Sequence, residues 1–235
     1  SIRGARRGVV ISSNVTATIT NCVIENTVEH GIEVVWDGSD PITDATLANN
    51  VVSSSENGSG IYFQFPQQGV QGFFSEQSSS AYVNIYGNIL VNNARYGMEV
   101  FCPDDWTNSE ERFASSYNYL SRNTIGPYSN CINTPDQFVS SSDITGGATG
   151  FLDSSAGCGS DVRLVADSPL RNAGRPGPAA RNPDGTRNDI GAYGGPFAEG
   201  FFTDPDDGPV VRQVIAPASV RKGDTITIQA TGAVR

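Results

Sequence analysis

The chain has 235 residues and a formal net charge of −10, with 25 Asp and Glu against 15 Lys and Arg. This acidic balance argues against a nucleic-acid partner, because phosphate binding needs basic residues gathered on one face. No window approaches the roughly 18 consecutive apolar residues of a membrane-spanning helix, so none is expected. The 26 Gly and 13 Pro residues predict many turns and few long helices.

The first half of the chain contains four copies of an internal repeat. Each copy opens on Gly, apolar, variable, apolar, at 8–11, 31–34, 60–63 and 97–100. A second pattern with a central polar position follows at 19–24, 47–52, 85–90 and 120–125. Aligned in this way, the copies form a column of Cys22, Asn50, Asn88 and Asn123. The spacing between copies grows along the chain, which indicates loops inserted between constant strands.

These copies predict short strands that must stack, because one copy cannot bury its apolar face alone. Stacking at ~4.8 Å places like side chains above one another and buries a continuous core. An inward Asn must be hydrogen-bonded, and stacked amides can satisfy one another as a ladder. Asn also tolerates the left-handed backbone of tight bends. Because Cys22 replaces Asn in the first copy, we expect the ladder to end or weaken there.

The repeat resembles the right-handed parallel β-helix family, the pectate-lyase-like solenoids, over roughly residues 8–196. This resemblance implies an all-β fold class, with a right-handed parallel β-helix as its main body. Lyases, hydrolases, esterases, adhesins and passive stalks all use that fold, so the resemblance does not name an activity.

The segment from residue 161 to 194 is similar to the C-terminal signature of a family of bacterial secreted β-helix proteins. The matching positions include Asp184, Gly185, Arg187, Asp189 and Tyr193. The resemblance implies an extracellular or cell-surface location in a bacterium. We expect the segment to cap the open end of the solenoid, with Arg187 and Asp189 bonding each other or loop backbone. A calcium site built on Asp184 and Asp189 is the alternative; no other cofactor is expected.

The C-terminal tail is expected to open a second domain. A Pro, Gly and Asp-rich linker at 201–209 precedes a segment at 216–230 that looks like the first strands of a bacterial immunoglobulin-like or fibronectin-like sandwich. Such a domain needs about 100 residues. The expected division is a capped β-helix at 1–196, a linker at 197–212 and incomplete sandwich strands at 213–235. Those strands could instead pack on the solenoid or pair with another chain.

The outward column of the Gly-anchored strands contains Val10, Glu33, Tyr62 and Glu99. Two copies separate Glu33 from Glu99, which places their backbones ~9–10 Å apart. Inverting glycosidases hold their two carboxyls about 6.5–9.5 Å apart, so Glu33 and Glu99 are the catalytic candidates. The candidate glycan-binding residues are Glu33, Tyr62, Glu99 and Trp106, the last in the long loop after the fourth copy. The alternative is two solvated glutamates on a strand.

The cysteines and the single histidine predict structural roles. No Cys-x-x-Cys pair exists, and His30 is the only histidine, so a zinc site is not expected. His30 is interpreted as a corner residue. Cys22 is expected to be buried and free. One disulfide is expected among Cys102, Cys131 and Cys158, with Cys131–Cys158 preferred.

The known catalytic sets of this fold are missing from the sequence. No Gly-His-Gly surrounds His30, and the only lysine, Lys222, lies outside the solenoid. Arg95 lies near Glu99, but no calcium-binding acid cluster accompanies them. The sequence therefore favours a non-enzymatic module that acts in scaffolding, adhesion or assembly. Its expected partners are a polysaccharide or cell-surface glycan, or other copies of the chain. The alternative is a fragment of a polysaccharide lyase or glycoside hydrolase acting on an acidic polysaccharide.

Overall fold

The structure is a computed structural model that describes residues 1–12, 15–35, 45–64, 83–101, 113–129, 144–145, 162–198, 210–215 and 229–233. The chain divides into two compact units, Ser1–Ala198 and Glu199–Arg235. In the second unit, β16 (Val210–Ile215) pairs antiparallel with β17 (Gln229–Ala233).

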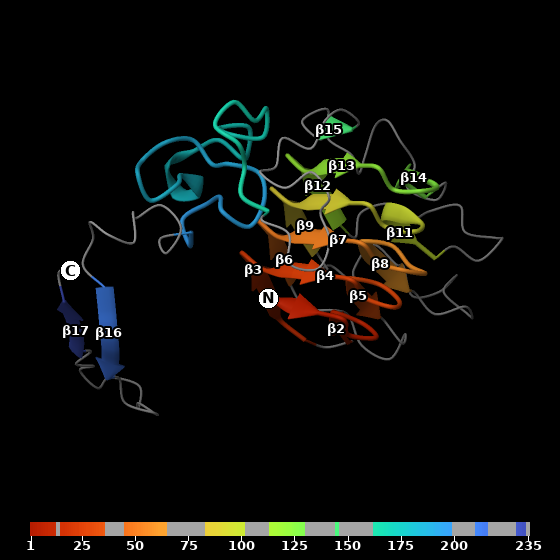
Figure 1. The fold of residues 1–235 in the computed structure, drawn as a ribbon, viewed down its shortest axis with the longest axis horizontal. Coiled ribbons are helices and arrows are strands. Elements are labelled where there is room, and N and C mark those ends of the chain that lie inside the picture. The colour runs from red at the N-terminus through yellow and green to blue at the C-terminus, as the bar shows by residue number, and fades with distance from the viewer. Residues whose placement is uncertain are drawn as a thin grey trace, which may run out of the picture. The chain divides into compact units, whose positions relative to one another are not determined.

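The first unit contains three parallel sheets that the chain visits in turn (Figure 1). Sheet A consists of β1 (Ile2–Arg3), β4 (Val23–Glu25), β7 (Val51–Ser53), β10 (Ile89–Val91), β13 (Tyr119–Ser121) and β15 (Ile144–Thr145). Sheet B consists of β2 (Val9–Ile11), β5 (Ile32–Val35), β8 (Ile61–Gln64), β11 (Tyr96–Val100) and β14 (Gly126–Tyr128). Sheet C consists of β3 (Ala17–Thr20), β6 (Ala45–Ala48), β9 (Val83–Tyr86) and β12 (Phe113–Ser116).

One pass through sheets B, C and A makes a rung, so rung 1 is β2–β3–β4 and rung 4 is β11–β12–β13. In Figure 1 the rungs stack from β2 to β14. Within the described residues the only helical element is the 3-10 turn Pro178–Ala180. The predicted all-β parallel β-helix is therefore confirmed.

The core of the solenoid consists of side chains that repeat from rung to rung. Ile32 pairs with Ile61 in sheet B, and Leu90 pairs with Leu120 in sheet A. All four are buried. Alternate residues of a strand point to opposite faces, so each strand contributes its inward positions to one continuous core. Burying each such side chain stabilises the fold by about 1.5–3 kcal/mol. A single rung could not bury them, so this stabilisation depends on stacking.

The glycine that opens each copy is required by close backbone approach. A Cβ on Gly60 would lie 2.8 Å from the carbonyl oxygen of Gly97 in the next rung. A Cβ on Gly97 would lie 2.9 Å from the carbonyl oxygen of Pro127. No side chain fits where one rung bends against the next, and the strand registers confirm the predicted glycine column.

The predicted asparagine ladder exists, but the fourth member is wrong. Asn50 donates its Nδ2 to Asn88 Oδ1 at 2.9 Å, and Asn88 donates in the same way to Asn118, not to Asn123. Cys22 ends the ladder as expected, since only its backbone N–H bonds Asn50 Oδ1. The fourth copy has Ser115 where earlier copies have an apolar residue, so the apolar pattern misplaces the alignment by five residues.

Asn123 belongs to a second ladder at the bend between sheets A and B. Asn93 donates its Nδ2 to Asn123 Oδ1 at 2.9 Å, and Ser55 donates its backbone N–H to Asn93 Oδ1. At both bends the left-handed residue is the one before the ladder position, as at Asn49 and Asn92. The ladder asparagines themselves do not have positive φ. The tolerance of Asn for a left-handed backbone therefore accounts for Asn49 and Asn92, whereas the ladder positions require Asn for its side-chain hydrogen bonds.

The C-terminal segment of the first unit lies along the side of the solenoid. Asn49 donates its Nδ2 to the Asp189 carbonyl, Gly191 donates its N–H to the Gly87 carbonyl, and the Arg187 guanidinium lies over Tyr117. A second apolar cluster joins the two parts; its buried members are Val51, Ile89, Val91, Tyr119, Val162, Leu170, Ile190 and Ala192. Residues 162–198, called the brace below, therefore lie along the left-handed bends, where the sequence predicted an end cap.

Candidate functional site

The polar column on the outer face of sheet B is assembled as the sequence predicted. Glu33 pairs with Tyr62 and Tyr62 with Glu99, so the two carboxylates lie two rungs apart with the tyrosine between them. The alternative reading, two solvated glutamates, does not hold, because both side chains are buried. Glu33 is 5% exposed and Glu99 is 7% exposed. Buried carboxylates need partners, which defines the chemistry of this face.

Two arginines neutralise the buried carboxylates. Arg7 donates its Nη1 to Glu33 Oε2 at 2.8 Å, and Arg95 donates its Nε to Glu99 Oε2 at 2.9 Å. The arginine side chains are 42% and 45% exposed, whereas their partners are largely covered. The arginine side chains are therefore the more exposed partners of these two ion pairs, and Arg7 Nε also lies 3.7 Å from Oε2 of Glu29, whose side chain is 34% exposed.

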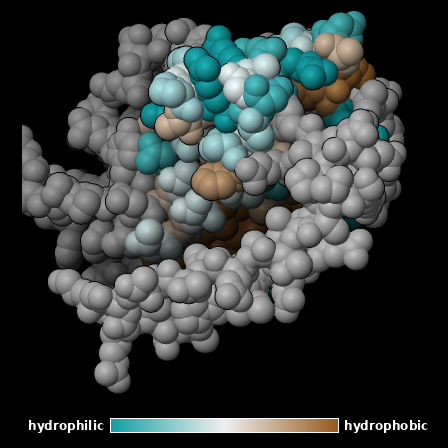
Figure 2. All heavy atoms as spheres, turned by 90° about the vertical axis from the view of Figure 1, so that its left-hand side faces the viewer, coloured by the Kyte–Doolittle hydropathy of each residue, from teal (hydrophilic) through white to brown (hydrophobic). Residues whose placement is uncertain are grey.

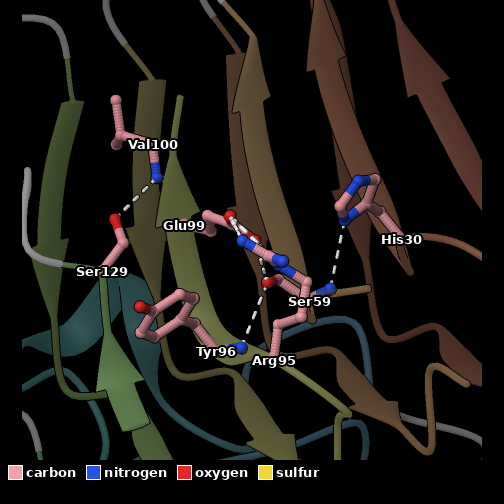
Figure 3. Close-up of polar contacts among 7 residues, drawn as sticks. All are labelled: His30, Ser59, Arg95, Tyr96, Glu99, Val100 and Ser129. Carbon is pink, nitrogen blue, oxygen red and sulfur yellow. Dashed lines mark hydrogen bonds and ion pairs between the residues drawn. The ribbon is translucent and has the colours of Figure 1, made fainter. Parts of the chain in front are cut away.

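Ser59 connects three rungs in a buried polar network (Figure 3). Its hydroxyl donates to Glu99 Oε2 at 2.5 Å and accepts the backbone N–H of Tyr96 at 3.1 Å. Its own backbone N–H donates to His30 Nδ1 at 3.1 Å. Ser59 and Arg95 both bond Glu99 Oε2, and Arg95 also bonds Oε1, so the carboxylate has little freedom to rotate.

His30 stacks on Tyr62 at the centre of the face. The ring centroids are 4.0 Å apart and the planes differ by 6°. Because Nδ1 accepts a hydrogen bond, the neutral tautomer carries its proton on Nε2. Burial lowers the pKa of His30 and keeps it neutral. Burial, together with the charges of Glu99 and Glu33, raises the pKa of Tyr62 to about 12.

The geometry does not support an acid/base pair. Burial alone would raise the pKa of Glu99, but the hydrogen bonds from Arg95 and Ser59 outweigh it, so the pKa is lowered. A general acid must hold its proton near the working pH, and Glu99 does not. Ser59 is also no nucleophile with a base, because its hydroxyl contacts Glu99 and His30 meets only its backbone. The arrangement is suited to positioning charged groups.

Of the other predicted site residues, Asp184 and Asp189 are not brought to this face. Trp106 lies outside the described residues, as do Cys102, Cys131 and Cys158. Cys22 is free as expected, but only half buried.

Asp184 and Asp189 lie in the brace and make separate local bonds. The exposed Asp184 accepts the Thr186 hydroxyl, whereas the buried Asp189 accepts the backbone N–H of Asn172 at 2.6 Å. Arg187 donates to the Gly174 carbonyl, so the expected bonding to loop backbone is what the brace uses. Across the part of the chain that is described, no three His, Cys, Asp or Glu side chains are placed to hold a metal ion. In that same part, no helix is long and apolar enough to span a membrane.

Sequence reasoning missed two members of the network. Arg7 and Ser59 each precede the glycine that opens a copy, as His30 and Tyr96 do. In the parallel register the four positions lie above one another beside the Glu33–Tyr62–Glu99 column. The sequence therefore contains a second column, but its four members are different residue types. A search for repeated residue types could not reveal it.

Comparison of the chain with family models, with curated proteins and with solved structures found no match in any of the three.

Proposed function

We propose that this chain is an extracellular β-helix module that serves as a scaffold and contacts glycans through sheet B. The contact face consists of Arg7, Tyr62 and Arg95, with Glu33 and Glu99 behind them. The observation that carries the proposal is the pair of exposed guanidinium groups, each fixed by a buried carboxylate on either side of an aromatic ring.

The chemistry of these groups supports recognition of a glycan. An arginine has five N–H donors in a planar fork, and the bonds to Glu33 and Glu99 leave some of them free on both Arg7 and Arg95. Such a fork matches carboxylate or sulfate groups and sugar hydroxyls. Fixing the side chain beforehand removes much of the rotamer entropy that binding would otherwise cost.

The same features favour binding without turnover. Hydrolysis with inversion needs one protonated and one ionised carboxyl. The hydrogen bonds to Glu99 lower its pKa, and Arg7 holds Glu33 in an ion pair. Both carboxylates are therefore committed to their arginines. We infer a recognition and scaffolding role in preference to a lyase or hydrolase.

The test is a glycan array probed with the full chain, in calcium and in chelator. The variants Arg7→Lys and Arg95→Lys keep the charge and lose the planar fork. Arg122→Lys is the matched control, because Arg122 is exposed on rung 4 and outside the contact face. We expect saturable binding to at least one glycan class that the first two variants weaken about tenfold and the control leaves unchanged.

Two results would overturn the proposal. One is the absence of binding to every glycan tested, which would leave a structural spacer. The other is binding that Arg7→Lys and Arg95→Lys leave unchanged, which would indicate bulk electrostatics instead of a built face, because both variants keep the positive charge. Circular dichroism and thermal melting of each variant separate loss of binding from loss of fold.

A further inference from the structure

A second concave site lies at the corner between sheets C and A, away from the sheet B face. It has a volume of about 340 Å³ and is formed by the bends of rungs 1 to 3 and the turn at 175–180. The residues that give it its character are Thr20, Tyr86, Arg175, Pro176, Pro178 and Phe197. Figure 2 views the side of the first unit on which the brace lies, where hydrophilic residues gather in the upper part and some apolar residues show between and below them. A cavity of this size takes a small organic molecule.

The walls of this corner cavity are rigid. Two prolines flank Gly177, which has φ +114, a backbone conformation that L side chains rarely adopt. The 3-10 turn Pro178–Ala180 follows directly. On the opposite wall, the register of β3, β6 and β9 fixes the bends. The shape is therefore held by backbone on both sides.

One charge dominates the corner cavity. Arg175 is the only charged residue among the described residues that line it, although the chain carries a net charge of −10. Its guanidinium lies over the Tyr86 ring, 5.0 Å from the centroid. Within the described part of the chain it makes no hydrogen bond or ion pair, so all five of its N–H donors remain available. At the rim, Phe197 is 72% exposed.

We propose that the corner cavity binds a small organic carboxylate with an apolar body. The carboxylate would accept two N–H groups of Arg175, because this pairing is bidentate and charge-assisted. The apolar body would lie against Pro176, Pro178 and Phe197. Arg175 is exposed, so the expected discrimination comes from the charge-assisted bidentate bond, which a neutral ligand cannot form. This site does not rest on the proposed function of the sheet B face.

The experiment is an NMR titration of the ¹⁵N-labelled full chain with sodium benzoate and with benzamide, its neutral counterpart. We expect saturable shifts at the amides of Tyr86, Arg175 and Gly177 with benzoate and at least tenfold weaker binding of benzamide. Arg175→Gln should weaken benzoate binding about tenfold or more, to a value near that of benzamide. Arg171→Gln, which removes the same charge from outside the cavity, should leave it unchanged.

The proposal is overturned if benzoate causes no saturable shift at these residues. It is also overturned if benzamide binds equally well, or if Arg171→Gln weakens binding as much as Arg175→Gln. Phe197→Ala provides a second test at an exposed position where folding is not at risk, and it should weaken benzoate binding. None of these variants touches Arg7 or Arg95, so failure here is distinguishable from failure of the glycan proposal.

Discussion

Replacing Asn88 by alanine should remove the centre of the first asparagine ladder. The side chain is fully buried and makes five hydrogen bonds. Its loss deprives the backbone N–H of Asn50 of its acceptor and the Leu47 carbonyl of an amide donor. A buried polar group left without a partner costs about 1–3 kcal/mol. Two or more such groups give an expected loss of about 4 kcal/mol in the free energy of unfolding.

The assay is urea unfolding followed by fluorescence, together with calorimetry. A loss of about 4 kcal/mol corresponds to a fall in Tm of about 8–16 °C for a chain of this size. Asn84→Ala is the matched control, since Asn84 lies on β9 of the same rung and its side chain makes no hydrogen bond within the described residues. The control should change stability by less than about 0.5 kcal/mol. Equal effects of the two substitutions, or a loss below about 1 kcal/mol for Asn88→Ala, would refute the reasoning.

Three further predictions concern packing and titration. Gly60→Ala should lower the free energy of unfolding by about 1–3 kcal/mol, because the new Cβ would clash with the Gly97 carbonyl. Gly126→Ala is the control and should be nearly neutral, since its Cβ would meet nothing closer than 3.7 Å. Urea unfolding of the two variants measures the difference. Burial raises the pKa of Glu25 and outweighs the ion pair with Arg3, whose Nε lies 2.9 Å from Glu25 Oε2. Its folded-state pKa therefore lies above the unfolded value, and the stability it contributes is lost as the pH rises through the folded pKa. Glu25→Gln should then raise Tm at neutral pH, with the gain vanishing near ~pH 4; a gain that persists there would contradict this reasoning. The Tyr62 titration is isolated by subtracting the tyrosinate absorbance of Tyr62→Phe from that of the unaltered chain, and its midpoint should lie near pH 12. A midpoint near the ordinary value of about 10 would mean that the ring is not held beside Glu33 and Glu99.

The sequence predicted the stacking well because its strongest signals are steric and periodic. The glycine column and the Glu33–Tyr62–Glu99 column follow from a strand register that four copies repeat. The fourth ladder position was misplaced because Ser115 and Tyr119 are poor matches to the apolar pattern, whereas Leu120, five residues from the aligned position, mimics it. Short repeats tolerate such slips until hydrogen bonds fix the register.

The arginine partners and the brace were harder to predict. Whether an outward glutamate is solvated or paired depends on the neighbouring rung, and Arg7 lies 26 residues from Glu33 in the sequence. The brace signature contains turn formers and small residues that fit an end cap as well as a flank. Its position depends on hydrogen bonds to bend residues such as Asn49, 140 residues earlier in the chain.

The central claim is that the sheet B face binds glycans without cleaving them. The most direct measurement takes the glycan bound best on the array and follows the release of reducing ends and of unsaturated products, in calcium and in chelator. We predict no product above the rate without protein, while binding remains saturable and sensitive to Arg95→Lys. Product formation that Glu33→Gln or Glu99→Gln abolishes would contradict the claim and identify the face as a catalytic site.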